Sequence, residues 1–184
     1  MIATVDEIFA VCARTGMKPM FSCHSNRDYG ILSPEEWRDV RRMLEKYGIL
    51  NQMQVKAAPV AVADMNDPEK SVFAGAYNVL GTDIDSYTLD YNNGSDKMTS
   101  NGLAHLKALN WYDPLICKIE YFDPETVTTG HLLTEEFIAP AKAEGLTISV
   151  ANDSTRTVER MHQLIEMGIT EFTEDVFYSF GLNY

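Results

Sequence analysis

Apolar positions along the chain recur in two alternating patterns. Longer stretches carry apolar side chains three and four positions apart, which is typical of amphipathic helices. Short, nearly continuous apolar runs lie between them and resemble buried strands. The pattern predicts helices over residues 4–15, 33–48, 67–75, 97–109, 134–145 and 153–168. It predicts strands over residues 17–23, 49–57, 77–84, 115–122, 146–151 and 169–173.

Helix start and stop signals support these boundaries. Thr4 and Glu7 have the spacing of a capping box, and Asp153 with Ser154 is the predicted cap of the last helix. A glycine follows four of the predicted helices, where the residue after a helix commonly adopts the left-handed conformation that is costly for a Cβ atom. These glycines are Gly16, Gly48, Gly145 and Gly168.

The repeated unit is helix, glycine and apolar strand. Strands that alternate with helices predict right-handed βαβ crossovers and a parallel sheet. We therefore expect an α/β protein in which residues 1–184 form a single domain of about six βα units. A complete eight-unit barrel typically needs roughly 250 residues, which is more than this chain has. The polar loop 86–97 is expected to be the most mobile segment.

Composition narrows the function classes. The chain has 15 basic and 27 acidic residues and a net charge of −12, so we expect no nucleic-acid partner. The three cysteines, Cys12, Cys23 and Cys117, have no metal-ligand spacing and are expected to be free and buried. No apolar run reaches the roughly 20 residues that span a bilayer. The N-terminus carries acids where a signal peptide has bases, so a cytoplasmic location is expected.

Both ends of the chain resemble one enzyme family. The run IATVDEIFAVCARTGMKPMFSCHS is similar to a segment of glycerophosphodiester phosphodiesterases that reads roughly "iPTLEEvL…GlKlniEiK". The run LLTEEFIAPAKAEGLTISVANDSTRTVERMHQLIEMGITEFTED is similar to their "Gl.v..WTVND…lldlGVDGIiTD". The resemblance covers nearly the whole chain. It implies an incomplete, TIM-type (β/α) barrel that lacks the first two strands of the family fold.

The resemblance also implies a chemistry, the hydrolysis of a glycerophosphodiester to glycerol phosphate and an alcohol with the help of Ca²⁺ or Mg²⁺. The family's "HRG", "ExD" and "HD" motifs have no match in this chain. Its metal-binding Glu aligns with Ser22, and the Lys that follows aligns with His24. Its aromatic residue in "WTVND" aligns with Ser149, so that only Asn152 and Asp153 of that motif remain. The metal is therefore expected only where the missing strands are supplied.

Candidate substrate-binding residues share a place in or directly after a predicted strand. They are Ser22, His24, Lys56, Glu120 and Asn152, and no residue is identified as catalytic or as a metal ligand. Active groups of α/β barrels lie at the C-terminal ends of the strands. His24 is either a replacement cation or general acid, or a surface loop histidine. Lys56 either meets a phosphate as a point charge or solvates a strand end.

Two acidic features leave further alternatives open. Glu120 either faces the barrel mouth or pairs with Lys118 along the same strand face. Asp83 and Asp85 share one face if they lie in a strand, which suits a cation, or they form a turn. None of these acids forms a motif by itself.

Two hypotheses of function follow. The first is a glycerophosphodiester phosphodiesterase-like hydrolase domain of lipid metabolism, inactive as this isolated chain, whose ligand is a small phosphodiester or a glycan phosphate. The alternative is a degenerate, non-catalytic barrel that acts as a binding or scaffolding module. The first hypothesis predicts an exposed apolar edge where strands are missing, covered by self-association, by a partner or by the N-terminal helix.

Overall fold

The computed structural model describes residues 3–23, 31–90, 102–122, 133–152 and 157–174. The helices are α1 (Val5–Thr15), α2 (Pro34–Tyr47), α3 (Val72–Leu80), α4 (Gly102–Lys107), α5 (Glu135–Ala143) and α6 (Val158–Glu166), with the short 3₁₀ helices η1 (Leu50–Gln52) and η2 (Val62–Asp64). The strands are β1 (Met20–Cys23), β2 (Gln54–Ala57), β3 (Ser86–Asp90), β4 (Cys117–Phe122), β5 (Thr147–Asn152) and β6 (Glu171–Glu174). Within these ranges no helix has the length and apolar character needed to cross a membrane.

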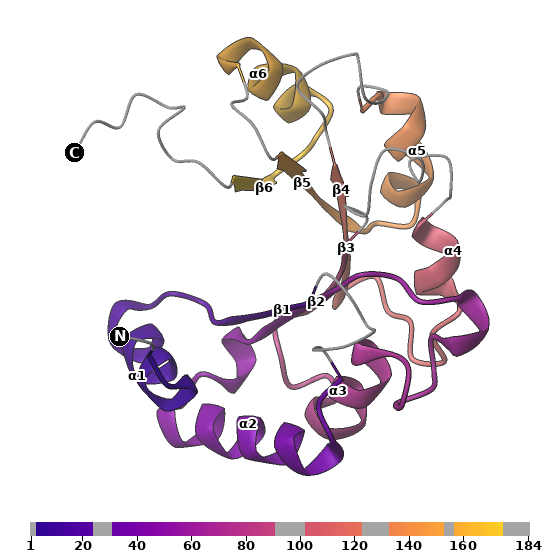
Figure 1. Cartoon of the computed structure of the whole chain (residues 1–184). Helices are drawn as coiled ribbons and strands as arrows, with labels where there is room; N and C mark the ends of the chain where they lie inside the picture. Colours follow the sequence, from indigo (N-terminus) through magenta and orange to yellow (C-terminus); the bar gives the residue numbers. More distant parts are fainter. Residues whose placement is uncertain (1–2, 24–30, 91–101, 123–132, 153–156, 175–184) are drawn as a thin grey trace.

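The strands form one parallel sheet whose spatial order follows the chain, from β1 to β6. The sheet is curled, and the helices cover its convex side (Figure 1). The register of the strands shows the stagger of a barrel. Asp90 pairs with Glu120, Glu120 with Ser149, and Ser149 with Glu171. The last residue of β3 is thus at the same level as the first residue of β6. The expected α/β architecture, an incomplete TIM-type barrel of six strands, is therefore confirmed.

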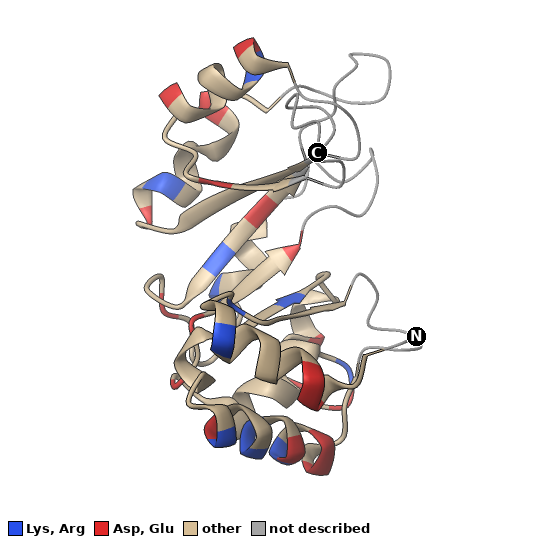
Figure 2. Cartoon of the chain, turned by 90° about the vertical axis from the view of Figure 1, so that its left-hand side faces the viewer, with Lys and Arg blue, Asp and Glu red and all other residues tan. Residues whose placement is uncertain are grey.

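The two faces of the sheet differ in chemistry because successive side chains of a strand point to opposite faces. On the convex face, Val55, Leu89 and Ile119 join the apolar core with the helix residues Trp37 and Leu44. On the concave face most of the alternate positions are polar, with Met20 and Ala151 as apolar exceptions. Figure 2, which views the molecule from the side where the curl opens, shows charged residues on the central strands.

The capping signals locate the first two helices correctly. The capping box of Thr4 and Glu7 opens α1, and that of Ser33 and Glu36 opens α2. The glycine that follows each of these helices has a positive φ, as expected. The predicted cap of the last helix is wrong, because α6 begins after Thr157, whose hydroxyl accepts a hydrogen bond from the amide of Arg160. Threonine is a preferred N-cap residue, and Thr157 stands directly before the first apolar position of the helix.

The third βα unit lies further along the chain than predicted. The predicted helix 67–75 and strand 77–84 are replaced by α3 and a turn, because Ser71 caps the helix and residues 77–80 continue it. Strand β3 instead occupies the start of the predicted loop 86–97, and all five of its residues are buried. The rest of that loop lies outside the described residues.

This shift also changes the place of two acids. Asp83 and Asp85 lie in the turn before β3, so the expectation that they share a strand face is wrong. Asp83 forms an ion pair with Arg41 on α2. The polar sequence of β3 misled the prediction, because its polar residues face the concave side rather than solvent at a loop tip.

An apolar surface lies along the open edge of the sheet. Among the described strands, β1 pairs only with β2. Val5, Ile8 and Met20 are each about half exposed here, and a groove of about 380 Å³ lies between them and α2. The expectation of an exposed apolar edge is confirmed for β1, whereas its covering by a partner or a second copy stays a prediction. The three cysteines are free and buried, as expected.

The core of the convex face makes a prediction about stability. Ile119 on β4 is fully buried, whereas Leu115, four residues earlier, is 86% exposed. We expect Ile119→Ala to lower the free energy of unfolding by about 2–5 kcal/mol because it leaves a cavity. The matched control Leu115→Ala should change it by no more than about 0.5 kcal/mol. Urea unfolding followed by circular dichroism measures both, and equal effects would refute this assignment of the core.

Candidate functional site on the concave face

Register arranges the concave face in levels of side chains, two of which hold its charged groups. One level, here called the carboxylate level, consists of Asp90, Glu120, Ser149 and Glu171, which are neighbours in register on β3 to β6. The other, the lysine level, consists of Ser22, Lys56, Thr88, Lys118 and Thr147 on β1 to β5. The carboxylate level lies nearer to the C-terminal ends of the strands, where α/β barrels place their functional groups.

Lys56 reaches from the lysine level to two carboxylates. Its ammonium forms a close ion pair with Glu120, and the Nζ atom lies 3.8 Å from Oδ2 of Asp90. The side chains are buried, with exposures of 4% for Lys56 and 2% for each acid. Charges are removed from water at high cost unless they are paired. One positive and two negative groups leave this cluster with a formal charge of −1.

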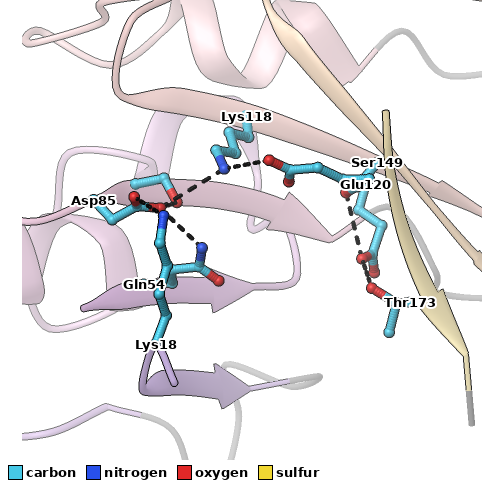
Figure 3. Close-up of polar contacts among 9 residues, drawn as sticks. Lys18, Gln54, Asp85, Lys118, Glu120, Ser149 and Thr173 are labelled. Carbon is cyan, nitrogen blue, oxygen red and sulfur yellow. Dashed lines mark hydrogen bonds and ion pairs between the residues drawn. The ribbon is translucent and has the colours of Figure 1, made fainter. Parts of the chain in front are cut away.

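Glu120 is fixed by hydroxyl groups as well as by the lysine. Thr173 on β6 donates a hydrogen bond of 2.6 Å to Oε2 of Glu120, and Ser149 on β5 donates one of 3.4 Å to the same oxygen (Figure 3). Contacts from β2, β5 and β6 therefore converge on one carboxylate of β4. A side chain that is held from three strands has a defined orientation.

A second ionic cluster lies toward the N-terminal ends of the strands. Asp85 accepts hydrogen bonds from Lys18 and Gln54, and it lies 3.7 Å from the ammonium of Lys118 (Figure 3). Lys118 also donates a 2.7 Å hydrogen bond to Glu171. Burial raises the pKa of Asp85, but the two hydrogen bonds and the charge of Lys118 outweigh burial and hold the pKa below its usual 3.8. This cluster balances its own charge.

A cavity of about 290 Å³ lies on the concave face beside these clusters. Its polar lining consists of Gln54, Thr88, Glu120, Ser149, Glu171 and Thr173. Carboxylate and hydroxyl oxygens predominate in this lining. The cavity can therefore accept hydrogen bonds from the hydroxyl groups of a ligand.

The predicted site residues have different places. Lys56 and Glu120 meet in the buried cluster, so the expectation of a lysine that merely solvates a strand end is wrong. The proposed pairing of Glu120 with Lys118 is also wrong, because Lys118 pairs with Asp85 and Glu171. Ser22 is exposed on β1. Whether these residues bind a substrate stays a prediction.

Two further predicted residues are only partly described or not described. His24 lies outside the described residues. Asn152 ends β5, and only its backbone is described.

Sequence reasoning missed Asp90 and Thr173. Asp90 was assigned to a polar loop, although the alternation of Tyr87 and Leu89 with Thr88 and Asp90 is the period-two signal of a strand with one polar face. Thr173 was included in a predicted strand without a role. A hydroxyl that contacts a residue 53 positions away can be recognised only once the register is known.

The family resemblance implies Ca²⁺ or Mg²⁺, and the described residues test whether such an ion fits. Hard divalent ions bind sets of oxygen ligands. Asp90 and Glu120 both face the ammonium of Lys56. In the described part of the chain no three His, Cys, Asp or Glu side chains are grouped so that they could hold a metal ion. The residues described here therefore do not fit the divalent ion.

Comparisons with known proteins bear on the fold. No known family profile matches the chain, and no curated protein matches it. The structure resembles a crystal structure from Galdieria sulphuraria named as a "putative glycerophosphodiester phosphodiesterase", with a TM-score of 0.67 and 16% identity over 99% of this chain. A structure of PaMucR phosphodiesterase in complex with c-di-GMP has 13% identity and a TM-score of 0.40 over 80% of this chain and 68% of the PaMucR chain. That similarity is too low to show a shared fold.

The similarity to the Galdieria protein confirms the resemblance at the level of the fold. At 16% identity it shows the arrangement of strands and helices alone. The chain spans 63% of the length of that protein.

The Lys56 cluster makes a prediction about stability. Lys56→Met leaves two buried carboxylates without their cation, so we expect a loss of about 3–5 kcal/mol in the free energy of unfolding. The control Lys70→Met removes a lysine that is 57% exposed and paired with Asp64 and Asp67 at the surface. Its urea midpoint should stay close to that of the wild type. Equal midpoints for the two variants would contradict the buried pairing.

The lowered pKa of Asp85 predicts a pH dependence. A carboxyl group whose pKa is lower in the folded state stabilises the fold above its unfolded pKa, and this stability is lost as the pH falls through the folded pKa. Asp85→Asn should therefore be less stable than the wild type at pH 7, and the gap should narrow below about pH 4, near the unfolded pKa. Urea unfolding at pH 7, 5 and 3 measures this gap. A gap that is constant with pH would exclude the proposed ionisation.

Proposed function

We propose that this chain is a glycerophosphodiester phosphodiesterase-like barrel domain that binds a small phosphodiester or glycan phosphate on its concave face and does not hydrolyse it as the isolated chain. The observation that carries the proposal is the buried charged cluster of Lys56, Asp90 and Glu120 near the C-terminal ends of the strands. The fold similarity to the Galdieria protein supports the barrel architecture on which the proposal rests.

The concave face offers different chemistry to the two parts of such a ligand. The cavity lining of Glu120, Glu171 and hydroxyl groups suits the hydroxyls of a glycerol or sugar. Lys56, which belongs to the lysine level and contacts Glu120 of the cavity lining, is the cation for the phosphate group and acts as a point charge. We therefore expect the phosphate beside the ammonium of Lys56 and the hydroxylated part along the oxygen-rich lining of the cavity.

Hydrolysis requires more functional groups in a site than binding does. It needs positive charge on the phosphoryl oxygens and a group that transfers a proton to the leaving oxygen. The charge of Lys56 is balanced by two carboxylates. Ser22 and Ser149 stand where the family resemblance expects a carboxylate and an aromatic residue. These features favour binding without turnover.

A second candidate function is a non-catalytic module that recognises a neutral glycan. The formal charge of −1 on the Lys56 cluster and the acceptor-rich cavity favour this ligand, because neutral hydroxyl groups meet no repulsion there. The two candidates differ in whether the phosphate and Lys56 contribute to binding.

Calorimetric titration separates the candidates. We expect glycerophosphocholine to bind more tightly than glycerol or N-acetylglucosamine. Lys56→Met should weaken binding of the diester at least tenfold, since a hydrogen bond to a charged group contributes about 1.5–3 kcal/mol. Lys56→Arg, which keeps the charge, should retain most of the affinity. Lys142→Met on α5, away from the concave face, is the control.

Three outcomes decide the proposal. Release of glycerol phosphate by the isolated wild-type chain contradicts the claim that it does not hydrolyse the diester. Binding of the neutral sugar that is independent of Lys56 supports the glycan module instead. Absence of binding for glycerophosphocholine at millimolar concentration refutes the phosphodiester ligand. Circular dichroism of each variant establishes that it is folded.

A further inference from the structure

We propose that Lys56 is the built-in cation of the concave face: its ammonium takes the position between Asp90 and Glu120 that a divalent ion would take in a carboxylate site. The wild-type site then needs neither Ca²⁺ nor Mg²⁺, and exchange of Lys56 for an acid converts it into a divalent-ion site. The inference concerns the side chains of this chain and does not depend on which ligand the concave face binds.

The first step is the geometry of the two acids. Asp90 and Glu120 are neighbours in register on adjacent strands, so their side chains leave the sheet side by side on the concave face. Both carboxylates face one ammonium, in close contact for Glu120 and at 3.8 Å for Asp90. Two carboxylates that face a common point from fixed strands resemble a cation site. Here that point is taken by the side chain of Lys56.

The second step is competition between cations. A divalent ion that enters beside the buried ammonium meets a like charge at short range in surroundings that screen charge poorly. One Glu120 oxygen already contacts Lys56, and the other accepts hydrogen bonds from Thr173 and Ser149. The ion would have to displace the buried ammonium of Lys56 from both carboxylates. The ammonium therefore excludes the ion.

The third step is the effect of replacing the lysine. Lys56→Glu brings a third carboxylate to the two that are present and changes the formal charge of the cluster from −1 to −3. The hydroxyl oxygens of Ser149 and Thr173 lie within reach of the same Glu120 oxygen. Carboxylates and hydroxyls are hard oxygen ligands of the kind that Ca²⁺ binds. Buried carboxylates without a cation destabilise the fold, so the ion should restore the stability that the exchange removes.

Thermal unfolding with and without Ca²⁺ tests the inference. The melting temperature of the wild-type chain should be the same in EDTA, in 5 mM CaCl₂ and in 5 mM MgCl₂, because the concave face is expected to bind neither ion. An ion that did bind would raise the melting temperature, and the shift would be large at a concentration on the order of 1,000 times its Kd. Lys56→Glu should melt lower in EDTA and recover in CaCl₂. The double variant Lys56→Glu/Glu120→Gln should lose at least tenfold in Ca²⁺ affinity relative to Lys56→Glu. The matched control Lys56→Gln lacks the third acid and should respond less.

Calorimetric titration of the wild-type chain with Ca²⁺ completes the test. Saturable binding that Asp90→Asn or Glu120→Gln abolishes overturns the proposal. If neither variant alters the binding of Ca²⁺, the ion binds outside the concave face. That result supports the proposal. A folded Lys56→Glu variant that does not respond to Ca²⁺ overturns it. If Lys56→Glu stays unfolded in both buffers, the wild-type titration alone decides by these criteria.

Discussion

The concave face depends on one buried ionic contact, that between Lys56 and the carboxylates of Glu120 and Asp90. The period of two along each strand directs every second side chain to this face, and in this sequence most of those positions are polar. Polar and charged groups can remain buried only where they are paired. Lys56 supplies that pairing across β2, β3 and β4, and Thr173 and Ser149 extend it to β5 and β6. The sheet thus tolerates two adjacent acids because one lysine lies between them.

The two faces of the sheet have separate roles. The convex face holds the apolar core and provides the hydrophobic stabilisation through residues such as Trp37, Leu44 and Ile119. The concave face contributes little apolar burial and consists of groups that hydrogen-bond. Chemistry on the concave face can therefore change without removing the packing that holds the helices in place. The open β1 edge is the exception, because its apolar residues Val5, Ile8 and Met20 stay about half exposed.

The sequence predicted an element correctly where the residues of one short segment determine its structure. The capping boxes at Thr4 and Ser33 placed α1 and α2 because the cap forms within three residues. The third unit was misplaced because the short segment 77–80, with Tyr77, Val79 and Leu80, suits a helix and a strand equally. The charged cluster shows the same limit of sequence reasoning. Lys56 and Glu120 were recognised as candidates from their positions in predicted strands, whereas Asp90 was not. Its partner lies on another strand, and only the register brings the two together.

The likeness to the Galdieria protein reaches as far as backbone arrangement, since 16% identity leaves most side chains different. A shared barrel fold hosts many chemistries, so function has to be argued from the side chains of the site. On the concave face these side chains are a lysine enclosed by two acids, two hydroxyls and an acceptor-lined cavity. A hydrolytic barrel that uses a metal ion leaves carboxylates open for that ion. Here the acids are already neutralised in part by Lys56, a cation that the chain holds covalently, so they are not open to a free ion in the same way.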